Sequence, residues 1–128
     1  MRNKYYAKEM VTSDGVFDSR KEYHFWCILK RRQENGEITD LQRQVKFVLI
    51  PTQYEIVEEF TSKGHRKETK KVAERECSYV ADFVFTDVAS GQRKVIDVKS
   101  EITEKNKEFV IKRKLMLWVH NIKIEIWK

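Results

Sequence analysis

The chain has 128 residues, of which 36% are charged and 41% hydrophobic, and its formal net charge is +6. This length suits one domain, residues 1–128, and is too short for two typical ones, and the composition excludes a disordered chain. We find no apolar run of about 18 residues and no apolar segment near Met1, so we expect neither a membrane span nor a signal peptide. The two cysteines, Cys27 and Cys77, lie far apart and form no metal-binding pair, so we expect a reduced, cytoplasmic setting.

Positive charge is concentrated in two stretches. A basic protein favours polyanionic partners, of which nucleic acid is the commonest in the cytoplasm. Each stretch therefore suggests contact with a phosphate backbone, although a solvated surface would have the same composition. The first stretch contains Lys63, Arg66, Lys67, Lys70 and Lys71, and the second contains Lys105, Lys107, Lys112, Arg113 and Lys114.

The first helix is predicted to follow a polar segment, residues 1–15, that we expect to be loosely held. Ser19-Arg20-Lys21-Glu22 has the form of a capping box, and Asn35-Gly36 is typical of a helix end. Glu22 lies on the same side as the apolar residues of this helix. It has two interpretations: it caps Ser19 reciprocally, or its carboxylate extends from the helix toward a metal site.

Two strands are predicted next. Gln44–Ile50 is a clear strand that ends at Pro51-Thr52, and Gln53–Phe60 alternates weakly enough to be a second one. The polar stretch Thr61–Glu74 is predicted to be a long hairpin loop or an exposed strand extension.

The central feature of the sequence is a hairpin within Tyr79–Ser100. Its two strands are rich in β-branched and aromatic residues, and Asp87, Ser90 and Gly91 supply turn chemistry between them. If the turn is centred between Ala89 and Ser90, Asp82 falls directly opposite Asp97, with Cβ atoms about 5 Å apart. Lys99 lies two residues beyond Asp97 and shares its face.

These three charges have two interpretations. The apolar neighbours indicate a buried hairpin, where two carboxylates repel each other unless a cation lies between them. Mg²⁺ suits such a pair, because it binds one or two carboxylates and keeps several waters. The alternative is an edge hairpin in which Asp82, Asp97 and Lys99 form a solvated salt bridge.

The chain is predicted to end with a helix from about Glu104 to His120, terminated by Asn121, and a strand over Ile122–Trp127. A helical crossover usually makes the next strand parallel to its neighbour. The order helix, antiparallel strands, helix, strand therefore predicts an α/β fold with a mixed sheet flanked by helices.

The spacing of Asp82 and Asp97-Val98-Lys99 resembles the motif of the PD-(D/E)xK nuclease superfamily. The wider arrangement is similar to a small phage and prophage branch of it, over roughly residues 15–127. Ala81 stands where the superfamily motif has Pro. The likeness rests on Phe17-Asp18-Ser19-x-x-Glu22, Leu41-Gln42-x-Gln44-x-Lys46-Phe47, Tyr79-x-Ala81-Asp82-Phe83 and Asp97-Val98-Lys99.

The resemblance implies a restriction-endonuclease-like αβββαβ core and a set of site residues. Asp82, Asp97 and the backbone carbonyl of Val98 would bind Mg²⁺ or Mn²⁺, and Glu22 would assist directly or through water. Lys99 would position the attacking water and offset charge in the transition state. Gln44 is a weaker candidate for the rim of the site.

We therefore expect a Mg²⁺-dependent endodeoxyribonuclease of phage or prophage type, acting in the cytoplasm of a bacterial host, with a homodimer as one arrangement. Lys63, Arg66, Lys67, Lys70, Lys71, Lys112 and Lys114 are the candidate DNA contacts. The alternative is a non-catalytic nucleic-acid-binding accessory module of phage replication or recombination. A third interpretation is a small interaction protein whose tryptophans mark a partner surface.

Overall fold

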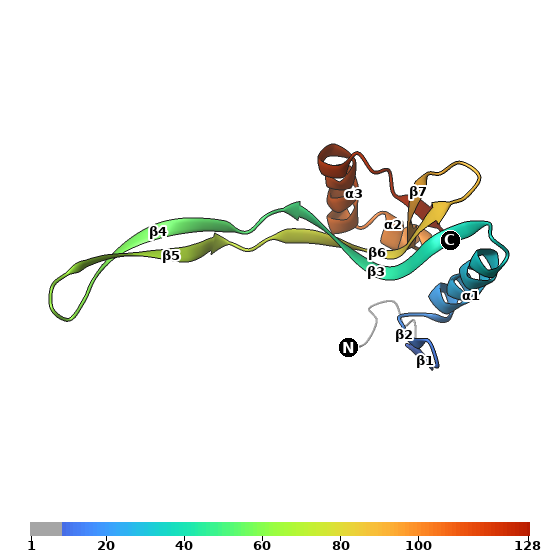
Figure 1. Cartoon of the computed structure of the whole chain (residues 1–128), viewed down its shortest axis with the longest axis horizontal. Helices are drawn as coiled ribbons and strands as arrows, with labels where there is room; N and C mark the ends of the chain where they lie inside the picture. The colour runs from blue at the N-terminus through green and yellow to red at the C-terminus, as the bar shows by residue number, and fades with distance from the viewer. Residues whose placement is uncertain (1–8) are drawn as a thin grey trace.

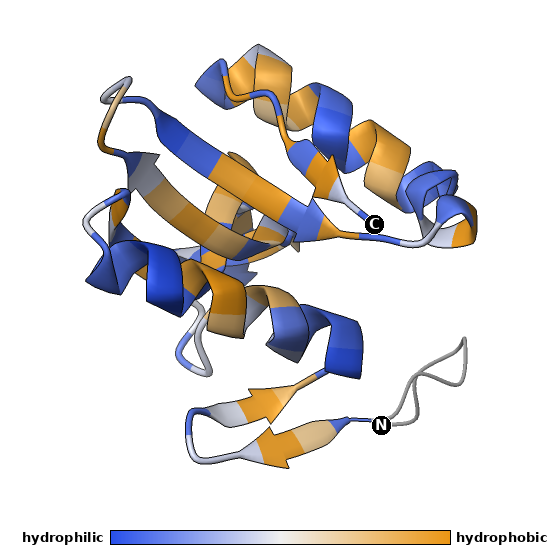
Figure 2. Cartoon of the chain, turned by 90° about the vertical axis from the view of Figure 1, so that its right-hand side faces the viewer, coloured by the Kyte–Doolittle hydropathy of each residue, from blue (hydrophilic) through white to orange (hydrophobic). Residues whose placement is uncertain are grey.

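A mixed four-stranded sheet lies between two helices in the computed structural model, which describes residues 9–128. The strand order is β3 (Ile38–Ile50), β6 (Cys77–Asp87), β7 (Arg93–Val98) and β8 (Glu125–Trp127). Helix α1 (Arg20–Glu34) covers one face and α3 (Lys107–His120) covers the other (Figure 2). The predicted α/β class with a mixed sheet flanked by helices is confirmed at this level.

The pairing of the strands follows the predicted directions. β3 pairs with β6 and β6 with β7 in antiparallel fashion, whereas β7 and β8 are parallel. The last strand is shorter than predicted, because pairing begins at Glu125 rather than Ile122. Helix α3 lies on one face of the sheet, so the chain must first cross from that face to the sheet edge. Residues 121–124 make this connection before β8 begins to pair.

Helix α1 begins and ends where the sequence predicted. The Ser19 side chain accepts a hydrogen bond of 3.1 Å from the Glu22 backbone N–H, and Asn35 occupies the C-terminal cap. The buried Leu29 packs with Phe83 and Ile96 of the sheet. This cluster fixes α1 against β6 and β7, and thereby fixes the direction in which Glu22 projects.

The second predicted helix is divided in two. A short helix, α2 (Glu101–Glu104), precedes α3, which begins at Lys107. Asn106 starts α3 because its side chain accepts hydrogen bonds from the backbone N–H groups of Glu108 and Phe109. Asn121 ends α3 in the left-handed conformation, with φ of 56°. The break between α2 and α3 lies beside the Asp82–Asp97 site.

A two-stranded ribbon projects away from the sheet as a continuation of β3 and β6 (Figure 1). It consists of β4 (Gln53–Phe60) and β5 (Arg66–Glu74), which pair in antiparallel fashion. We call residues Gln53–Glu74 the β-arm. Of the two predictions for Thr61–Glu74, the strand extension is therefore correct for Arg66–Glu74, and only the turn at its tip is irregular.

Residues 10–17 form a small hairpin of β1 (Met10–Thr12) and β2 (Gly15–Phe17). Asp14, at its turn, accepts a hydrogen bond from the Trp26 indole N–H and contacts Lys30, both on α1. This hairpin includes residues 10–15 of the segment that the sequence predicted to be loosely held. Residues 1–8 of that segment lie outside the described residues.

Candidate functional site

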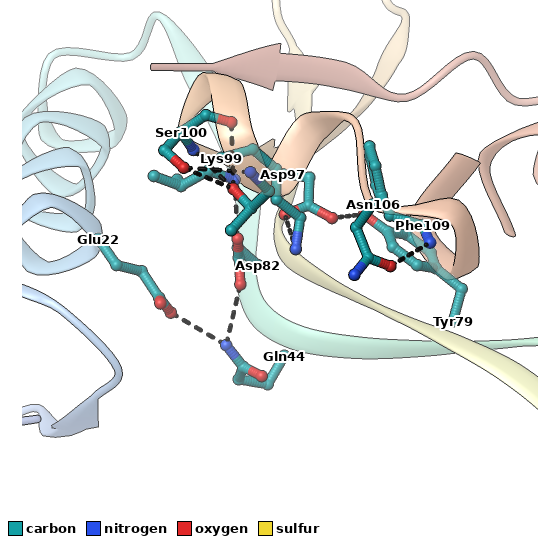
Figure 3. Close-up of polar contacts among 11 residues, drawn as sticks. Glu22, Gln44, Tyr79, Asp82, Asp97, Lys99, Ser100, Asn106 and Phe109 are labelled. Atoms are coloured by element: carbon teal, nitrogen blue, oxygen red, sulfur yellow. Dashed lines mark hydrogen bonds and ion pairs between the residues drawn. The ribbon is translucent and has the colours of Figure 1, made fainter. Parts of the chain in front are cut away.

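Asp82 and Asp97 lie next to each other at the end of the β6–β7 ladder. Phe83 pairs with Ile96 and Val84 with Val95, which is the register that the sequence predicted. At Asp82 the ladder is replaced by a side-chain contact, because Oδ2 of Asp82 accepts a hydrogen bond of 2.8 Å from the Val98 backbone N–H. The two strands therefore present both carboxyl groups at one point (Figure 3).

Both carboxylate oxygens of Asp97 have partners. The Tyr79 hydroxyl donates a hydrogen bond of 2.6 Å to Oδ2, and the Lys99 ammonium lies 3.5 Å from Oδ1. Asp97 is only 3% exposed. Burial, and next the charge of Asp97, raise the pKa of Tyr79 well above its ordinary value, so the hydroxyl keeps its proton and stays a donor at neutral pH.

Glu22 projects from α1 toward the same point. The Gln44 side-chain amide donates a hydrogen bond of 3.0 Å to Oε1 of Glu22 and lies 3.4 Å from Oδ1 of Asp82 (Figure 3). Glu22 is 4% exposed. Its backbone N–H completes the cap of Ser19, while its carboxyl group is turned toward β3 and β6. This position agrees with the second interpretation of Glu22, in which the carboxylate extends from the helix.

The backbone of β3 is strained beside the site. Gln44 has φ of 54° and Asp40 has φ of 55°, within a strand whose pairing with β6 is irregular between Thr39 and Gln42. A non-glycine residue in the left-handed region costs about 1–2 kcal/mol. Such strain persists where the surrounding structure imposes it, and it often accompanies function. Here it accompanies the residue whose amide links Glu22 with Asp82.

The electrostatics of the site favour a bound cation. Burial raises the pKa of Asp82 to about 8, with further contributions from the charges of Asp97 and Glu22. Burial, followed by the charge of Asp18, raises the pKa of Glu22. Burial therefore favours the protonated form of Asp82 and Glu22, and a divalent cation between Asp82 and Asp97 would favour the deprotonated form.

The Asp82–Asp97 pair fits Mg²⁺ or Mn²⁺ in the number and kind of its ligands. Within residues 9–128, no three His, Cys, Asp or Glu side chains come close enough together to hold a metal ion by themselves. A hard cation such as Mg²⁺ needs only one or two carboxylates, because waters and substrate oxygens complete its octahedron. The pair supplies oxygen ligands of that kind. The side-chain amide of Gln44 connects Glu22 to Asp82.

A cleft of about 560 Å³ opens over this pair. It lies between the sheet and the start of α3, so a molecule in the cleft would contact both carboxyl groups and the Lys99 ammonium. Lys112 projects into it from α3, where its ammonium also lies 3.1 Å from Glu108. The lining residues include Asp18, Gln44, Tyr79, Asp82, Asp97, Lys99, Asn106 and Lys112.

The basic residues that the sequence singled out are divided between two places. Lys112 lines the cleft and Lys114 is exposed on α3. Lys63, Arg66, Lys67, Lys70 and Lys71 all lie on the β-arm, away from the carboxylates. Arg66 is ion-paired with Glu58 and Glu68, and Lys71 with Glu59. The glutamates of β4 and β5 thus neutralise part of the positive charge that the linear sequence suggested for this region.

Tyr79 was not recognised as a site residue from the sequence. A buried tyrosine needs a partner for its hydroxyl group. That rule, applied to a Tyr in the same strand as Asp82, would have suggested a bond to one of the two carboxylates. Gln44 was recognised only as a rim residue, because nothing in its neighbours indicates a left-handed backbone.

The comparisons with known proteins give one result. A family model described as "Protein of unknown function (DUF1064)" matches residues 2–126. No curated protein and no solved structure matches the chain. Within the described part of the chain, no helix is both long enough and apolar enough to cross a membrane.

Proposed function

Because the chain belongs to the DUF1064 family, whose function is unknown, its activity must be inferred from its own residues, and we propose a divalent-metal-dependent endodeoxyribonuclease. The reaction is hydrolysis of DNA phosphodiester bonds. The observation that carries the proposal is the buried Asp97 carboxylate, held by Tyr79 and Lys99 next to Asp82 at the base of a cleft.

The arrangement of the chain supports the resemblance to the PD-(D/E)xK superfamily. A lone acid on one strand faces an acid-x-Lys triplet on the next, and a carboxylate approaches from the first helix. The order of helix, three antiparallel strands, helix and parallel strand is compatible with a restriction-endonuclease-like core. Together these features make phosphodiester hydrolysis the best explanation of the site.

Each residue then has a chemical role. Asp82, Asp97 and the Val98 carbonyl would hold the metal ion, with Glu22 assisting through water. The ion, when bound, would lower the pKa of a water and polarise a phosphoryl oxygen. The Lys99 ammonium would orient the attacking water and offset the negative charge that develops on the phosphoryl oxygens. The water oxygen would bond to phosphorus as the P–O3′ bond breaks, which leaves a 5′-phosphate and a 3′ oxygen that takes a proton from solvent. Tyr79 and Gln44 would position Asp97 and Glu22.

DNA would approach along the basic side of α3. Lys112 lines the cleft, and Lys114 lies nearby on the exposed surface. Contacts to phosphates give affinity without reading sequence. Cleavage that depends on DNA structure, for example at a branch, is compatible with such contacts.

The test is cleavage of labelled duplex, single-stranded, flap and four-way-junction DNA with Mg²⁺, with Mn²⁺ and with EDTA. We expect metal-dependent cleavage that Asp97→Asn abolishes while DNA binding is retained. Asp40→Asn is the matched control, since Asp40 is exposed on β3 and asparagine tolerates its left-handed backbone. Binding without cleavage in every metal would overturn the proposal in favour of a non-catalytic nucleic-acid-binding module.

A further inference from the structure

The β-arm is exposed along its whole length. Its two strands pair with each other, and neither packs extensively against another element of the described chain. Figure 1 shows the ribbon extending away from the sheet and both helices. A two-stranded ribbon by itself is marginally stable in water. A surface that covers one of its faces would therefore stabilise it.

One face of the β-arm carries more exposed apolar side chains than the other. Residues directly opposite each other in an antiparallel ladder share a face, and so do alternate residues of each strand. The face that contains Val57 has that residue half-buried. The first face carries four exposed apolar side chains, which we call the arm stripe: Tyr54 (53% exposed), Ile56 (65%), Phe60 (70%) and Val72 (51%).

The charges within the arm stripe's face argue against a nucleic acid as its partner. Glu58 lies directly opposite Glu68 in the middle of the face, and Lys70 and Arg66 lie on either side of them. The two acids and two bases cancel, and a phosphate backbone laid along the stripe would meet both carboxylates. A surface with no net charge and four exposed large apolar side chains fits a protein partner.

We propose that the arm stripe is the interface of a homodimer, in which the β-arms of two copies pack face to face and antiparallel. The proposal is independent of the nuclease proposal. The face consists of four cross-strand pairs, namely Tyr54–Val72, Ile56–Lys70, Glu58–Glu68 and Phe60–Arg66. A two-fold axis that passes between the second and third pairs, perpendicular to the strands, superimposes the face on its copy over its full length. The first pair then meets the fourth pair of the second copy, and the second pair meets the third.

That register opposes unlike charges at one position, because it sets Lys70 opposite Glu68 of the second copy. It also sets Tyr54 opposite Phe60 of the second copy. Glu58 and Arg66 face Ile56 and Val72 of the second copy, and they are ion-paired with each other within their own copy. An axis through the Glu58–Glu68 pair would instead bring four carboxylates together, which is strongly unfavourable. The same surface serves both copies, as an isologous two-fold interface requires. The face has eight side chains per copy, fewer than the roughly 20–30 residues a side of a standard interface, so we expect a weak dimer whose population depends on concentration.

The experiment is sedimentation velocity of the full chain over a wide concentration range, without DNA or metal. We expect a reversible dimer that Phe60→Glu converts to a monomer. Thr69→Glu is the matched control, because Thr69 lies on the opposite face of the same ribbon and its substitution should leave the dimer intact. Circular dichroism and thermal unfolding would verify that each variant keeps the core, which the β-arm does not enter.

A charge exchange tests the register. Glu68→Lys and Lys70→Glu should each weaken the dimer, and the two together should restore part of the loss, because the opposed pair is then reversed while the ion pair of Glu68 with Arg66 of its own copy stays broken. A monomer at all concentrations would overturn the proposal. So would a dimer that survives Phe60→Glu, or one that is lost instead in Trp118→Glu, since Trp118 is 86% exposed on α3 and would then mark the interface.

Discussion

The hydroxyl group of Tyr79 donates a 2.6 Å hydrogen bond to Oδ2 of Asp97, which is only 3% exposed. This bond comes from the strand that also carries Asp82, so β6 supplies one carboxylate and orients the other. The orientation leaves Oδ1 of Asp97 facing Lys99. A site with this much internal support is expected to respond to changes in residues that never touch the substrate.

Replacing Tyr79 by Phe should therefore weaken metal binding. The ring still fills its place in the core, but Asp97 loses its donor, and loss of such a supporting bond typically costs about 10–100-fold in metal affinity or activity. Calorimetric titration with Mn²⁺ measures the affinity directly. Tyr54→Phe, on the exposed β-arm, is the control. Equal Mn²⁺ affinity in the wild type and Tyr79→Phe would show that the bond does not orient a metal ligand.

Substitutions of Gln44 should separate strain from function. Gln44→Gly removes the amide but accepts φ of 54° without cost, whereas Gln44→Ala removes the amide and keeps the strain. We expect the glycine variant to be more stable than the alanine variant by about 1 kcal/mol. Cleavage should fall equally in both, because each leaves Glu22 without its donor. Thermal unfolding tests the predicted difference in stability, and cleavage rates test the predicted loss of activity. A Gln44→Gly variant that cleaves at the wild-type rate would contradict the predicted loss of activity.

The stability of the metal-free protein should fall as the pH rises from about 5 to 8. The pKa of Asp82 is raised from 3.8 to about 8 in the folded protein, so between these values the folded state holds a proton that the unfolded state has lost. Stability gained from that proton is complete below the unfolded pKa and is lost as the pH rises through the folded pKa. Thermal unfolding as a function of pH is the measurement.

Two controls bear on this pH dependence. Asp82→Asn should make it shallower, because asparagine does not ionise and only the smaller contribution from the raised pKa of Glu22 remains. Mg²⁺ should raise the unfolding temperature more at pH 8 than at pH 5, since the ion binds deprotonated carboxylates. A wild-type profile as flat as that of Asp82→Asn would mean that Asp82 is not the titrating group.

The basic residues of α3 and of the β-arm should contribute unequally to DNA binding. Lys114→Ala should weaken binding uniformly across sequences and reduce the slope of log K against log salt by about 1, the value for one lost phosphate contact. Lys71→Ala should change little, because the Lys71 ammonium is already paired with Glu59 at 2.6 Å. Salt-dependent titrations of labelled DNA with each variant measure both. A larger loss in Lys71→Ala would place the DNA on the β-arm.

The parts of the site that depend on local spacing were predictable from the sequence. The turn chemistry around Ser90 determined the β6–β7 register, and with it the meeting of Asp82 and Asp97. The Ser19 cap determined the start of α1 and so the face on which Glu22 lies. Each of these inferences needs only a few consecutive residues and a regular geometry.

The remaining features depend on contacts between distant parts of the chain. The left-handed backbone of Gln44 lies between neighbours that pair with β6 in unshifted register, and no local pattern indicates it. The Tyr79–Asp97 bond spans two strands. The net charge of residues 63–71 depends on the pairing of β5 with β4, which places Glu58 and Glu59 next to Arg66 and Lys71.

The place where the β-arm joins the sheet makes it separable from the rest of the protein. Ile50 lies opposite Cys77 at the end of the β3–β6 pairing, and the whole β-arm is inserted between these two residues. A two-residue turn such as Asn-Gly, which matches the twist of paired strands, can join them directly. The resulting shortened protein would keep Glu22, Gln44, Tyr79, Asp82, Asp97 and Lys99. We therefore expect the sheet and its two helices to fold without the β-arm, as a domain into which the β-arm is inserted.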